Sequence, residues 1–321
     1  MNRTPPPVDH PTWLYLKLYP GRPDLLDATL TEVVAPLVAQ VAPLASRWFF
    51  LRYLDTTGAH VRLRFHLAGP AADALAERRA ELTGRLEALA DRPAPDRPAP
   101  TALPASAAPG AVPSAGRAQG RPEVRLDLYE PEYAKWGGPR YLEVAERTFQ
   151  ASSATALRLL DASDGTLEHR LALGGSVMTG LLDRLGLTGE QRAGFLRTHY
   201  AWWSGRRHAQ PADGAARDTA LRTLHDRLLP TVRERAERLL ATGPESEMIS
   251  RLCADMLLGI EDRGPQQKPL FLAFHHLHLS LNRLGIVPVE EALVSLSAGS
   301  YPETVRTIPV PSPVPARSEE S

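Results

Sequence analysis

The stretch from Trp48 to Leu67, WFFLRYLDTTGAHVRLRFHL, constrains the fold of this chain more than any other. Two runs of bulky aromatic, β-branched and aliphatic residues flank Asp55-Thr56-Thr57-Gly58, and a glycine in a short polar link between such runs indicates a β-hairpin. Side chains of the second run alternate strictly between two faces. One face carries Val61, Leu63, Phe65 and Leu67, and the other, which we call the basic face, carries His60, Arg62, Arg64 and His66.

The partner strand decides how the basic face is interpreted. Like charges on one strand face repel unless water or an anion lies over them, so this face is either an exposed surface or the floor of a site for an anionic or hydrogen-bond-accepting ligand. In the first run both faces carry apolar groups, which is typical of a strand pair covered on both sides. We therefore expect the arginines to line a pocket. The two faces of the first run are Trp48, Phe50 and Arg52, and Phe49, Leu51 and Tyr53.

Any anion binding by this chain must come from local clustering. The 321 residues include 37 Lys and Arg and 37 Asp and Glu, so the formal net charge is zero, which argues against a general nucleic-acid or membrane-surface binder. The single cysteine, Cys253, excludes an internal disulfide and a cysteine zinc site, and its apolar surroundings favour a core residue. Neither a secretory signal nor a stretch of about eighteen apolar residues is present, so we expect a cytoplasmic protein.

The order of patterns predicts an α+β fold that begins with a ferredoxin-like β-α-β-β-α-β unit over 1–138. Residues 92–122 are dominated by Pro, Ala, Gly and Ser without hydrophobic periodicity, so we interpret them as a disordered insertion within this unit. The expected elements are a strand at 13–19, a helix at 24–45, the hairpin, a helix at 70–89 and a strand at 123–129.

From Pro139 onward the expected elements are helices. We expect them to form a unit over 139–298 that packs over the ferredoxin-like unit and completes the pocket, followed by a flexible tail over 299–321. Apolar positions recur with helical spacing at 141–160, 167–185, 188–204, 219–240, 248–260, 269–284 and 289–296.

Common cofactor and hydrolase motifs are absent from the chain. The patterns GxxxxGK[ST], GxGxxG, GxSxG and HExxH do not occur. The segment FHHLH at 274–278 is the only cluster that resembles a metal site, but no carboxylate or cysteine lies at ligand spacing nearby and zinc needs at least a third ligand. We therefore expect no metal and no cofactor, and interpret these histidines as core or acid/base residues.

One polar cluster lies where the last expected strand meets the helical region. The segment YEPEYAKWGG, residues 129–138, contains Tyr129, Glu132 and Lys135. A Glu next to a Lys is either part of a reactive site or a structural ion pair that holds a turn, and the residues alone leave both interpretations open.

A second cluster is the segment HLSLNR at 278–283. On a helix His278 and Asn282 lie one turn apart, so an amide could orient an imidazole used for acid/base chemistry. An aromatic group at 199–204 includes Trp202, and core packing is the simpler interpretation of its tryptophans.

Five separated motifs occur in one order over nearly the whole chain. They are Trp48–Tyr53, His60–Phe65, the Tyr-Glu-x-Glu segment that ends in Gly137-Gly138, Glu146–Phe149 and His278–Arg283. Together they resemble the elimination domain of lantibiotic dehydratases and its stand-alone relatives in thiopeptide biosynthesis. The resemblance implies an enzyme that acts on a ribosomally made precursor peptide, whose leader the protein holds and whose core enters the basic pocket.

The eliminase members of this family remove glutamate from glutamylated Ser or Thr and leave dehydroalanine or dehydrobutyrine. They use an arginine of an HxRxR strand, a second arginine just before the Tyr-Gly-Gly of a YxxExxRYGG segment, and the histidine of an HMxxNR segment. Carried over to this chain, the first arginine falls on Arg62 or Arg64, and the histidine falls on His278. Lys135 stands at the second arginine, and Trp136 replaces the tyrosine.

These departures bear on the reaction. Lys135 cannot form the two-pronged grip with which Arg holds a carboxylate, and Ser152-Ser153 stands where the family has an Asp-Ser pair. The second branch of the family, the pyridine synthases, joins two dehydroalanines in a formal (4+2) cycloaddition and then loses water and the leader peptide. We favour this cyclase reaction, with the eliminase second and a non-catalytic leader-peptide-binding subunit third.

The cycloaddition needs two alkenes held together, a donor that polarises an amide and an acid/base that assists loss of water. Expected partners are the precursor peptide and other enzymes of the pathway, with no nucleic acid and no membrane. The predicted catalytic residues are His278, Arg62, Arg64, Tyr129, Glu132, Lys135 and Ser280. The predicted substrate-binding residues are Arg52, His60, His66, Trp202, Asn282 and Arg283.

Overall fold

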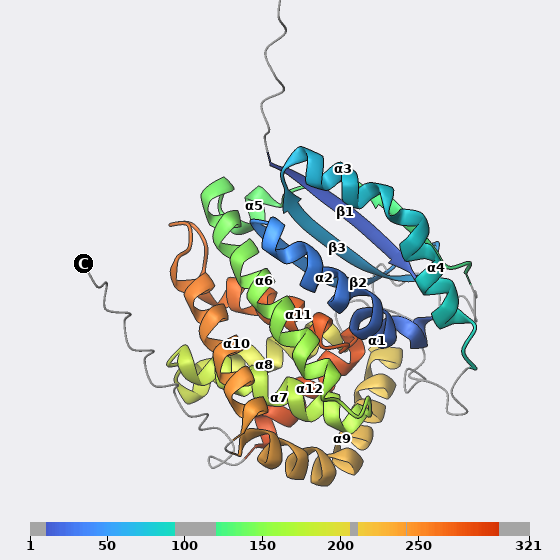
Figure 1. The fold of residues 1–321 in the computed structure, drawn as a ribbon. Coiled ribbons are helices and arrows are strands. Elements are labelled where there is room, and N and C mark those ends of the chain that lie inside the picture. Colours follow the sequence, from blue (N-terminus) through green and yellow to red (C-terminus); the bar gives the residue numbers. More distant parts are fainter. Residues whose placement is uncertain (1–10, 94–119, 206–210, 242, 302–321) are drawn as a thin grey trace, which may run out of the picture.

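The computed structural model of this chain describes residues 11–93, 120–205, 211–241 and 243–301. Most of the predicted insertion at 92–122 and of the predicted tail at 299–321 lies outside these ranges. A four-stranded antiparallel sheet with its own helices comes first, and a largely helical region follows (Figure 1). The predicted α+β class is therefore confirmed.

The four strands form one sheet in the order β2-β3-β1-β4, with every neighbouring pair antiparallel. β2 and β3 are joined by the predicted hairpin, in which the Asp55 amide donates to the Gly58 carbonyl over 3.2 Å. Gly58 has a φ of 141°, which glycine adopts without strain, so the sequence itself sets the position of this turn. The strands are β1 (Thr12–Tyr19), β2 (Arg47–Leu54), β3 (Ala59–Leu67) and β4 (Glu123–Asp127).

The helical segment Pro23–Leu44 packs its apolar side on the sheet. It is long and apolar enough to cross a membrane, but its buried side chains, among them Leu30, Val34 and Leu37, belong to one core with Leu63 of β3. We therefore interpret the segment as a core helix. It consists of η1 (Pro23–Leu25), α1 (Leu26–Ala28), η2 (Thr29–Val34), α2 (Ala35–Val41) and η3 (Ala42–Leu44).

Two further helices follow the hairpin, α3 (Gly69–Glu77) and α4 (Arg79–Ala90), where the sequence predicted one helix. In Figure 1 they lie with α2 on the near side of the sheet. The side chains of Val61, Leu63 and Phe65 are fully buried beneath these helices. The basic face of β3 is therefore turned to the other side of the sheet.

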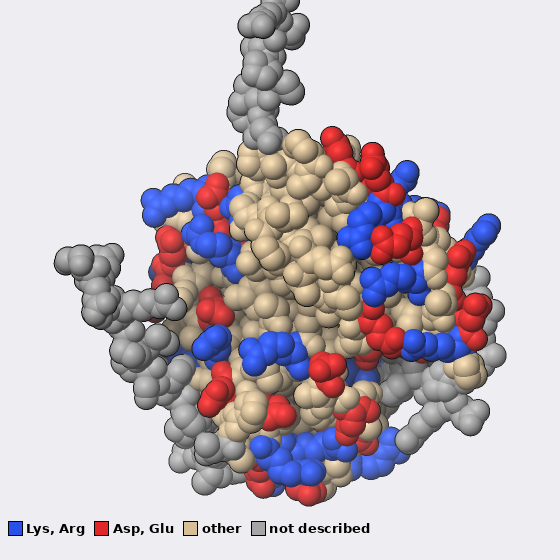
Figure 2. Space-filling view, viewed as in Figure 1, with Lys and Arg blue, Asp and Glu red and all other residues tan. Residues whose placement is uncertain are grey.

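The surface over α2 and α3 has no concentration of positive charge. Figure 2 shows a broad uncharged area on this face, with Lys and Arg interspersed with Asp and Glu around it. This distribution agrees with the balanced composition, which left anion binding to local clusters.

The helical region lies on one side of the sheet and reaches it mainly through α6 and α11, which contact β2 (Figure 1). The seven predicted helices are confirmed, although α9 begins eight residues earlier than predicted, and the single turn α5 was missed because it is too short to show a period. The helices are α5 (Tyr133–Trp136), α6 (Pro139–Asp161), α7 (Leu167–Arg184), α8 (Gly189–Trp203), α9 (Pro211–Leu240), α10 (Pro244–Glu261), α11 (Pro269–Arg283) and α12 (Pro288–Ser300).

Two glycines in the middle of α7 allow close packing against α12 and the residues that flank it. A Cβ atom on Gly174 would lie 2.6 Å from Ile286 Cδ1, and a Cβ atom on Gly175 would lie 2.9 Å from Tyr301 Cζ. We expect Gly175→Ala to lower the free energy of unfolding by about 1–3 kcal/mol, because an extra methyl group in a tightly packed core displaces its neighbours. Urea denaturation measures the change.

The matched control is Gly194→Ala, in the middle of α8, where a Cβ atom meets only Arg197 Nη2 at 3.8 Å. This change is expected to be neutral or to stabilise by about 0.5–1 kcal/mol, since alanine restricts the unfolded chain. Equal effects of the two substitutions would show that the contact between α7 and Tyr301 tolerates a side chain.

Candidate functional site

Side chains of α6 and α11 satisfy the outer backbone edge of β2, which we call the β2 edge. An unpaired sheet edge would otherwise offer its N–H and C=O groups to other chains. These bonds hold α11 against the sheet and so determine where that helix presents His278. The bonds run from Trp48 N to Gln150 Oε1 (3.1 Å), Phe50 N to Ser153 Oγ (3.1 Å), Arg52 N to Asn282 Oδ1 (2.9 Å), Asn282 Nδ2 to Arg52 O (3.0 Å) and Arg283 Nε to Phe50 O (2.9 Å).

Three of the predicted substrate-binding residues take part in this edge. Arg283 is fully buried, and burial, together with the charge of Arg64, lowers its pKa to about 9. Arg52 pairs with Asp27 at 2.5 Å and donates from Nε to the Arg283 carbonyl at 3.2 Å. The side-chain amide of Asn282 accepts from the Arg52 N–H and donates to the Arg52 carbonyl, so it is directed at the strand and not at His278.

The strand register gathers Arg64 with aromatic side chains on the basic face. Arg64 of β3 lies opposite Tyr15 of β1 and Phe49 of β2. Its guanidinium carbon lies 4.2 Å from the Tyr15 ring centre, 5.3 Å from that of Phe49 and 5.2 Å from that of Tyr129. Only 7% of the residue is exposed. The expected cover over this part of the basic face is therefore present.

Arg64 carries a buried positive charge without a partner among the described residues. Its Nε and Nη1 atoms are buried and make no hydrogen bond there. The nearby carboxylates are engaged elsewhere, because Asp127 pairs with Lys17 at 2.6 Å and Glu146 lies 3.3 Å from Arg47. Burial lowers the pKa of Arg64, since a low-dielectric environment disfavours the charged form. Arg64 therefore has two donor nitrogens without an acceptor among the described residues.

The other members of the basic face have different environments. Arg62 is half-buried and stacks on Tyr53, with its guanidinium carbon 3.3 Å from the ring centre. His60 is fully buried, and burial lowers its pKa to about 4, so it is neutral near pH 7. His66 is half-buried at the other end of β3 and lies 2.6 Å from Ser46 Oγ. Of the four side chains on the basic face, Arg62 and Arg64 are therefore the candidates for binding an anion.

The segment after β4 places Tyr129 beside Arg64. The Tyr129 hydroxyl donates to Glu146 Oε1 at 3.0 Å, and burial followed by the Glu146 charge raises the pKa of Tyr129. Burial also raises the pKa of Glu146. Further along, Lys135 pairs with the exposed Glu132 at 3.3 Å. This geometry fits the second interpretation of the two residues, a structural ion pair that holds a turn.

His278 is bound to a buried carboxylate that the sequence did not single out. Its Nδ1 atom lies 2.6 Å from Glu291 Oε1 of α12, and its ring stacks on Trp203 with the centres 4.4 Å apart. The imidazole is 26% exposed and the carboxylate is 0% exposed. One ring nitrogen therefore faces the protein interior while the ring retains access to solvent.

Aromatic contacts connect Arg64 with His278. The rings are packed centre to centre at 4.4 to 6.4 Å, and we call this set the aromatic connection. It passes from Arg64 through Phe49, Phe149, Trp136, His275, Phe274 and Trp203 to His278. Burial lowers the pKa of His275 to about 4, so the connection carries no charge of its own near pH 7.

Two further predicted residues lie apart from this arrangement. Ser280 is buried, where its hydroxyl contacts Ser152 Oγ at 3.0 Å and Met256 Sδ at 3.4 Å. Trp202 is exposed, beside Phe274 at 6.0 Å between ring centres. Among the described residues, no group of three His, Cys, Asp or Glu side chains is arranged to hold a metal ion.

Sequence reasoning passed over two residues of the site. Glu291 is one of two acidic residues on α12, a helix whose other side chains are mostly apolar, and that contrast was the available signal. His199 belongs to the aromatic group at 199–204, but its contact with Glu291 could not be predicted. The Nε2 atom of His199 lies 3.4 Å from Glu291 Oε2, although the two residues are far apart in the sequence. Neither spacing nor periodicity links the two residues.

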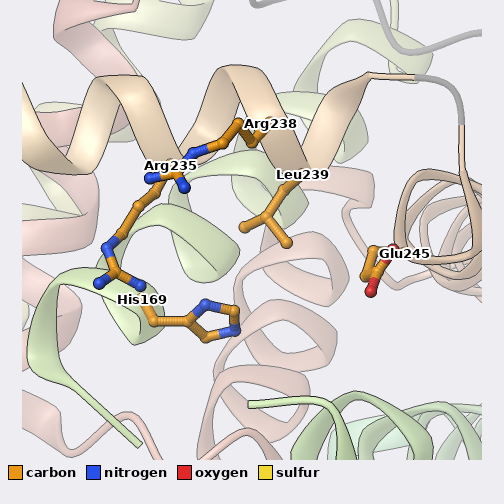
Figure 3. Close-up of a pocket in the computed structure, with 5 residues that line it drawn as sticks. All are labelled: His169, Arg235, Arg238, Leu239 and Glu245. Carbon is orange, nitrogen blue, oxygen red and sulfur yellow. The ribbon is translucent and has the colours of Figure 1, made fainter. Parts of the chain in front are cut away.

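The cavity drawn in Figure 3 belongs to another part of the molecule. It has a volume of about 240 Å³ and is lined by His169, Arg235, Arg238, Leu239 and Glu245, with the His169 ring below the α9 side chains and Glu245 to the right of them in the view. Its arginines are engaged, because Arg235 pairs with Asp164 and Arg238 with Glu234. None of the predicted site residues contributes to this cavity.

The comparison with known families assigns the chain. The family model described as Lantibiotic biosynthesis dehydratase C-term matches residues 13–301. This chain belongs to that lantibiotic dehydratase C-terminal family. The resemblance inferred from five motifs is therefore confirmed, and the matched range includes Arg64 and His278.

Solved structures of similar fold include both branches considered for this family. The tRNA-dependent lantibiotic dehydratase MibB from Microbispora sp. 107891 is 27% identical, with a TM-score of 0.55 over 95% of this chain, which spans 29% of that protein's chain. The pyridine synthase TbtD from thiomuracin biosynthesis is 19% identical, with a TM-score of 0.56, and the match covers 89% of this chain and 96% of that chain. TsrL is 15% identical, with a TM-score of 0.54, 94% of this chain and 99% of that chain covered. No curated protein matches.

Proposed function

We propose that this family member eliminates glutamate from glutamylated Ser or Thr residues of a ribosomally made precursor peptide. The unpaired guanidinium of Arg64 is the observation that carries this proposal. A buried charge without a partner costs several kcal/mol, and a protein retains such a charge where a ligand or a reaction supplies the countercharge. The glutamate carboxylates of the substrate would supply it.

In the proposed reaction Arg64 and His278, at the two ends of the aromatic connection, have different roles. A base removes the α-proton of the glutamylated residue, the Cβ–O bond breaks, and glutamate leaves as the carbon–carbon double bond forms. Arg64, assisted by the half-buried Arg62, would bind the expelled carboxylate. His278 would serve as the acid/base group, because its ring is partly exposed and has a buried carboxylate on Nδ1.

Identity supports the same choice. MibB, a dehydratase, is 27% identical to this chain, and TbtD, a pyridine synthase, is 19% identical. This order differs from the one favoured on the sequence, where Lys135 in place of an arginine argued for the cyclase.

The pyridine-forming cyclase is the second candidate, and Lys135 is the observation that favours it. The ammonium group pairs with Glu132 in this structure and offers no planar grip for a second carboxylate. In this alternative Tyr129, held by Glu146, would polarise the reacting amide, and His278 would assist the loss of water.

We also propose that the first part of the chain is a ferredoxin-like unit. Its elements follow the order strand, helix, strand, strand, helix, strand, and the strands take the spatial order β2-β3-β1-β4. In this division the unit covers 1–138, and the helical unit over 139–298 closes the substrate site.

One assay separates the candidates. The purified protein is incubated with a glutamylated precursor peptide and, in parallel, with a dehydroalanine-containing precursor, and the products are followed by mass. Loss of glutamic acid from the first supports the eliminase. A ring-bearing product and a released leader peptide from the second would replace that proposal with the cyclase. No change in either peptide would leave a leader-binding subunit.

His278→Asn is the variant that tests the acid/base role. Its amide can still donate to Glu291 from about the position of Nδ1, but the second ring nitrogen is lost. We expect turnover to fall by about 10²–10⁴-fold, as for loss of a general acid/base group, with leader-peptide affinity unchanged. Wild-type turnover in this variant would remove His278 from the mechanism.

A further inference from the structure

A network of hydrogen bonds surrounds Glu291 and assigns the proton of its neighbour His199. Trp203 Nε1 donates to His199 Nε2 at 3.2 Å. His199 Nε2 is then an acceptor, so the proton of His199 is on Nδ1, which donates to Ser295 Oγ at 2.8 Å. The Ser295 hydroxyl in turn donates to the Glu291 carbonyl at 3.0 Å. Each of these three donors then has one acceptor.

This assignment leaves His278 as the strong donor to the Glu291 carboxylate. With the His199 proton on Nδ1, Glu291 Oε2 receives no proton from Nε2, although the two atoms are 3.4 Å apart. The adjacent Glu290 has its own partners, Arg170 at 2.8 Å and the Val287 amide at 3.1 Å. A fully buried carboxylate needs a hydrogen-bond donor, and with His199 protonated on Nδ1 the described residue placed to donate to it is His278, whose Nδ1 lies 2.6 Å from Glu291 Oε1.

We propose that Glu291 is a positioning residue that acts through His278. By accepting from Nδ1, the carboxylate keeps the imidazole proton on that atom and leaves the Nε2 lone pair available to take a proton from the substrate. It also stabilises the imidazolium that forms when Nε2 is protonated, as the buried carboxylate of a catalytic triad does. Stacking on Trp203 fixes the plane of the ring. The expected effect on the rate rests on the proposed function. The expected position of the His278 proton rests on the structure alone.

Glu291→Gln is the principal test. The amide has nearly the same shape but can donate to Nδ1, which places the imidazole proton on Nε2, where it blocks the base. We expect kcat to fall by about 10²–10⁴-fold, the range for a wrong tautomer, while KM changes by less than about threefold. Glu291→Asp, which keeps the charge, should retain more activity than the glutamine variant despite its greater change in length.

Glu290→Gln is the matched control. Glu290 is adjacent in sequence, is 3% exposed and loses an equivalent ion pair in the variant, but its partner is Arg170 and not His278. We expect wild-type kcat from this protein. If Glu290→Gln and Glu291→Gln lowered kcat equally, the effect would come from general loss of packing in α12, and the inference would fail.

A second variant and a spectroscopic measurement make the test independent of folding and of the reaction. In a His278→Asn background Glu291→Gln should cause no further loss of kcat, because a residue that acts through His278 has nothing left to position. The chain has 10 histidines, so the His278 nitrogen resonances are assigned by their absence from that variant. Nitrogen-15 spectra of wild-type protein should show the proton on Nδ1, and those of Glu291→Gln should show it on Nε2.

The same proton position in wild type and Glu291→Gln would overturn the inference, and so would additive losses in the double variant. If the wild-type protein converts neither peptide, the proposed function fails, and the nitrogen-15 spectra still decide whether Glu291 sets the tautomer of His278.

Discussion

Replacing Arg64 with methionine is expected to remove most of the elimination activity and to make the protein more stable. Methionine fills a similar volume among Tyr15, Phe49 and Tyr129 but carries no charge. Without the guanidinium the expelled carboxylate has no donor at this position, and we expect kcat to fall by about 10²–10³-fold.

The gain in stability follows from the balance of two effects at Arg64. Contact with three rings favours the cation by about 2 kcal/mol or more, whereas burial of an unpaired ion costs several kcal/mol. Burial also lowers the pKa of Arg64, because low-dielectric surroundings disfavour the charged form. We therefore expect the free energy of unfolding to rise by about 1–2 kcal/mol, measured by urea denaturation.

Arg62→Met is the control for this prediction. Arg62 is half-buried and stacks on Tyr53, so its removal loses a favourable contact and relieves little burial. We expect no gain in stability from it. Added glutamate should raise the melting temperature of the wild-type protein and leave that of Arg64→Met unchanged, because only a folded state that binds the anion is stabilised. An Arg64→Met protein that is less stable and fully active would make Arg64 structural.

Asn282→Ala is expected to cause the largest loss of stability among single changes at the β2 edge. The variant removes the acceptor for the Arg52 amide and the donor to the Arg52 carbonyl. Each unsatisfied group costs about 1–3 kcal/mol, and partial access of water reduces this, so we expect a loss of about 2–4 kcal/mol. Since domains of this kind are stable by about 5–15 kcal/mol, urea denaturation should show a clear shift.

Gln150→Ala provides the comparison along the same edge. It removes only the acceptor for the Trp48 amide, in a half-buried position, and should cost about 1 kcal/mol. The comparison also tests the sequence-based prediction that Asn282 binds substrate. If Asn282→Ala were no less stable than Gln150→Ala but failed to bind the leader peptide, Asn282 would contact the peptide and not support the fold.

The positions of most elements could be predicted because periodicity is local. The alternation from His60 to Leu67 placed Arg62 and Arg64 on one face of β3, and the observed register keeps them there. Helical spacing located most helices to within a few residues, although α9 begins eight residues earlier than predicted and one helix divides at Arg78. Five motifs in one order were sufficient to identify the family, which the match over residues 13–301 confirms.

The sequence by itself determined which side chains share a face, because that depends only on the repeat of a strand or a helix. Only the tertiary structure decided which partner each polar group meets. Strand register pairs Asp127 with Lys17 and leaves Arg64 without a carboxylate partner among the described residues. Packing between distant helices and strands bonds Asn282 to the backbone of β2 and brings Glu291 into contact with His278. Such pairings depend on how elements cross in space, and no spacing along the chain encodes that geometry.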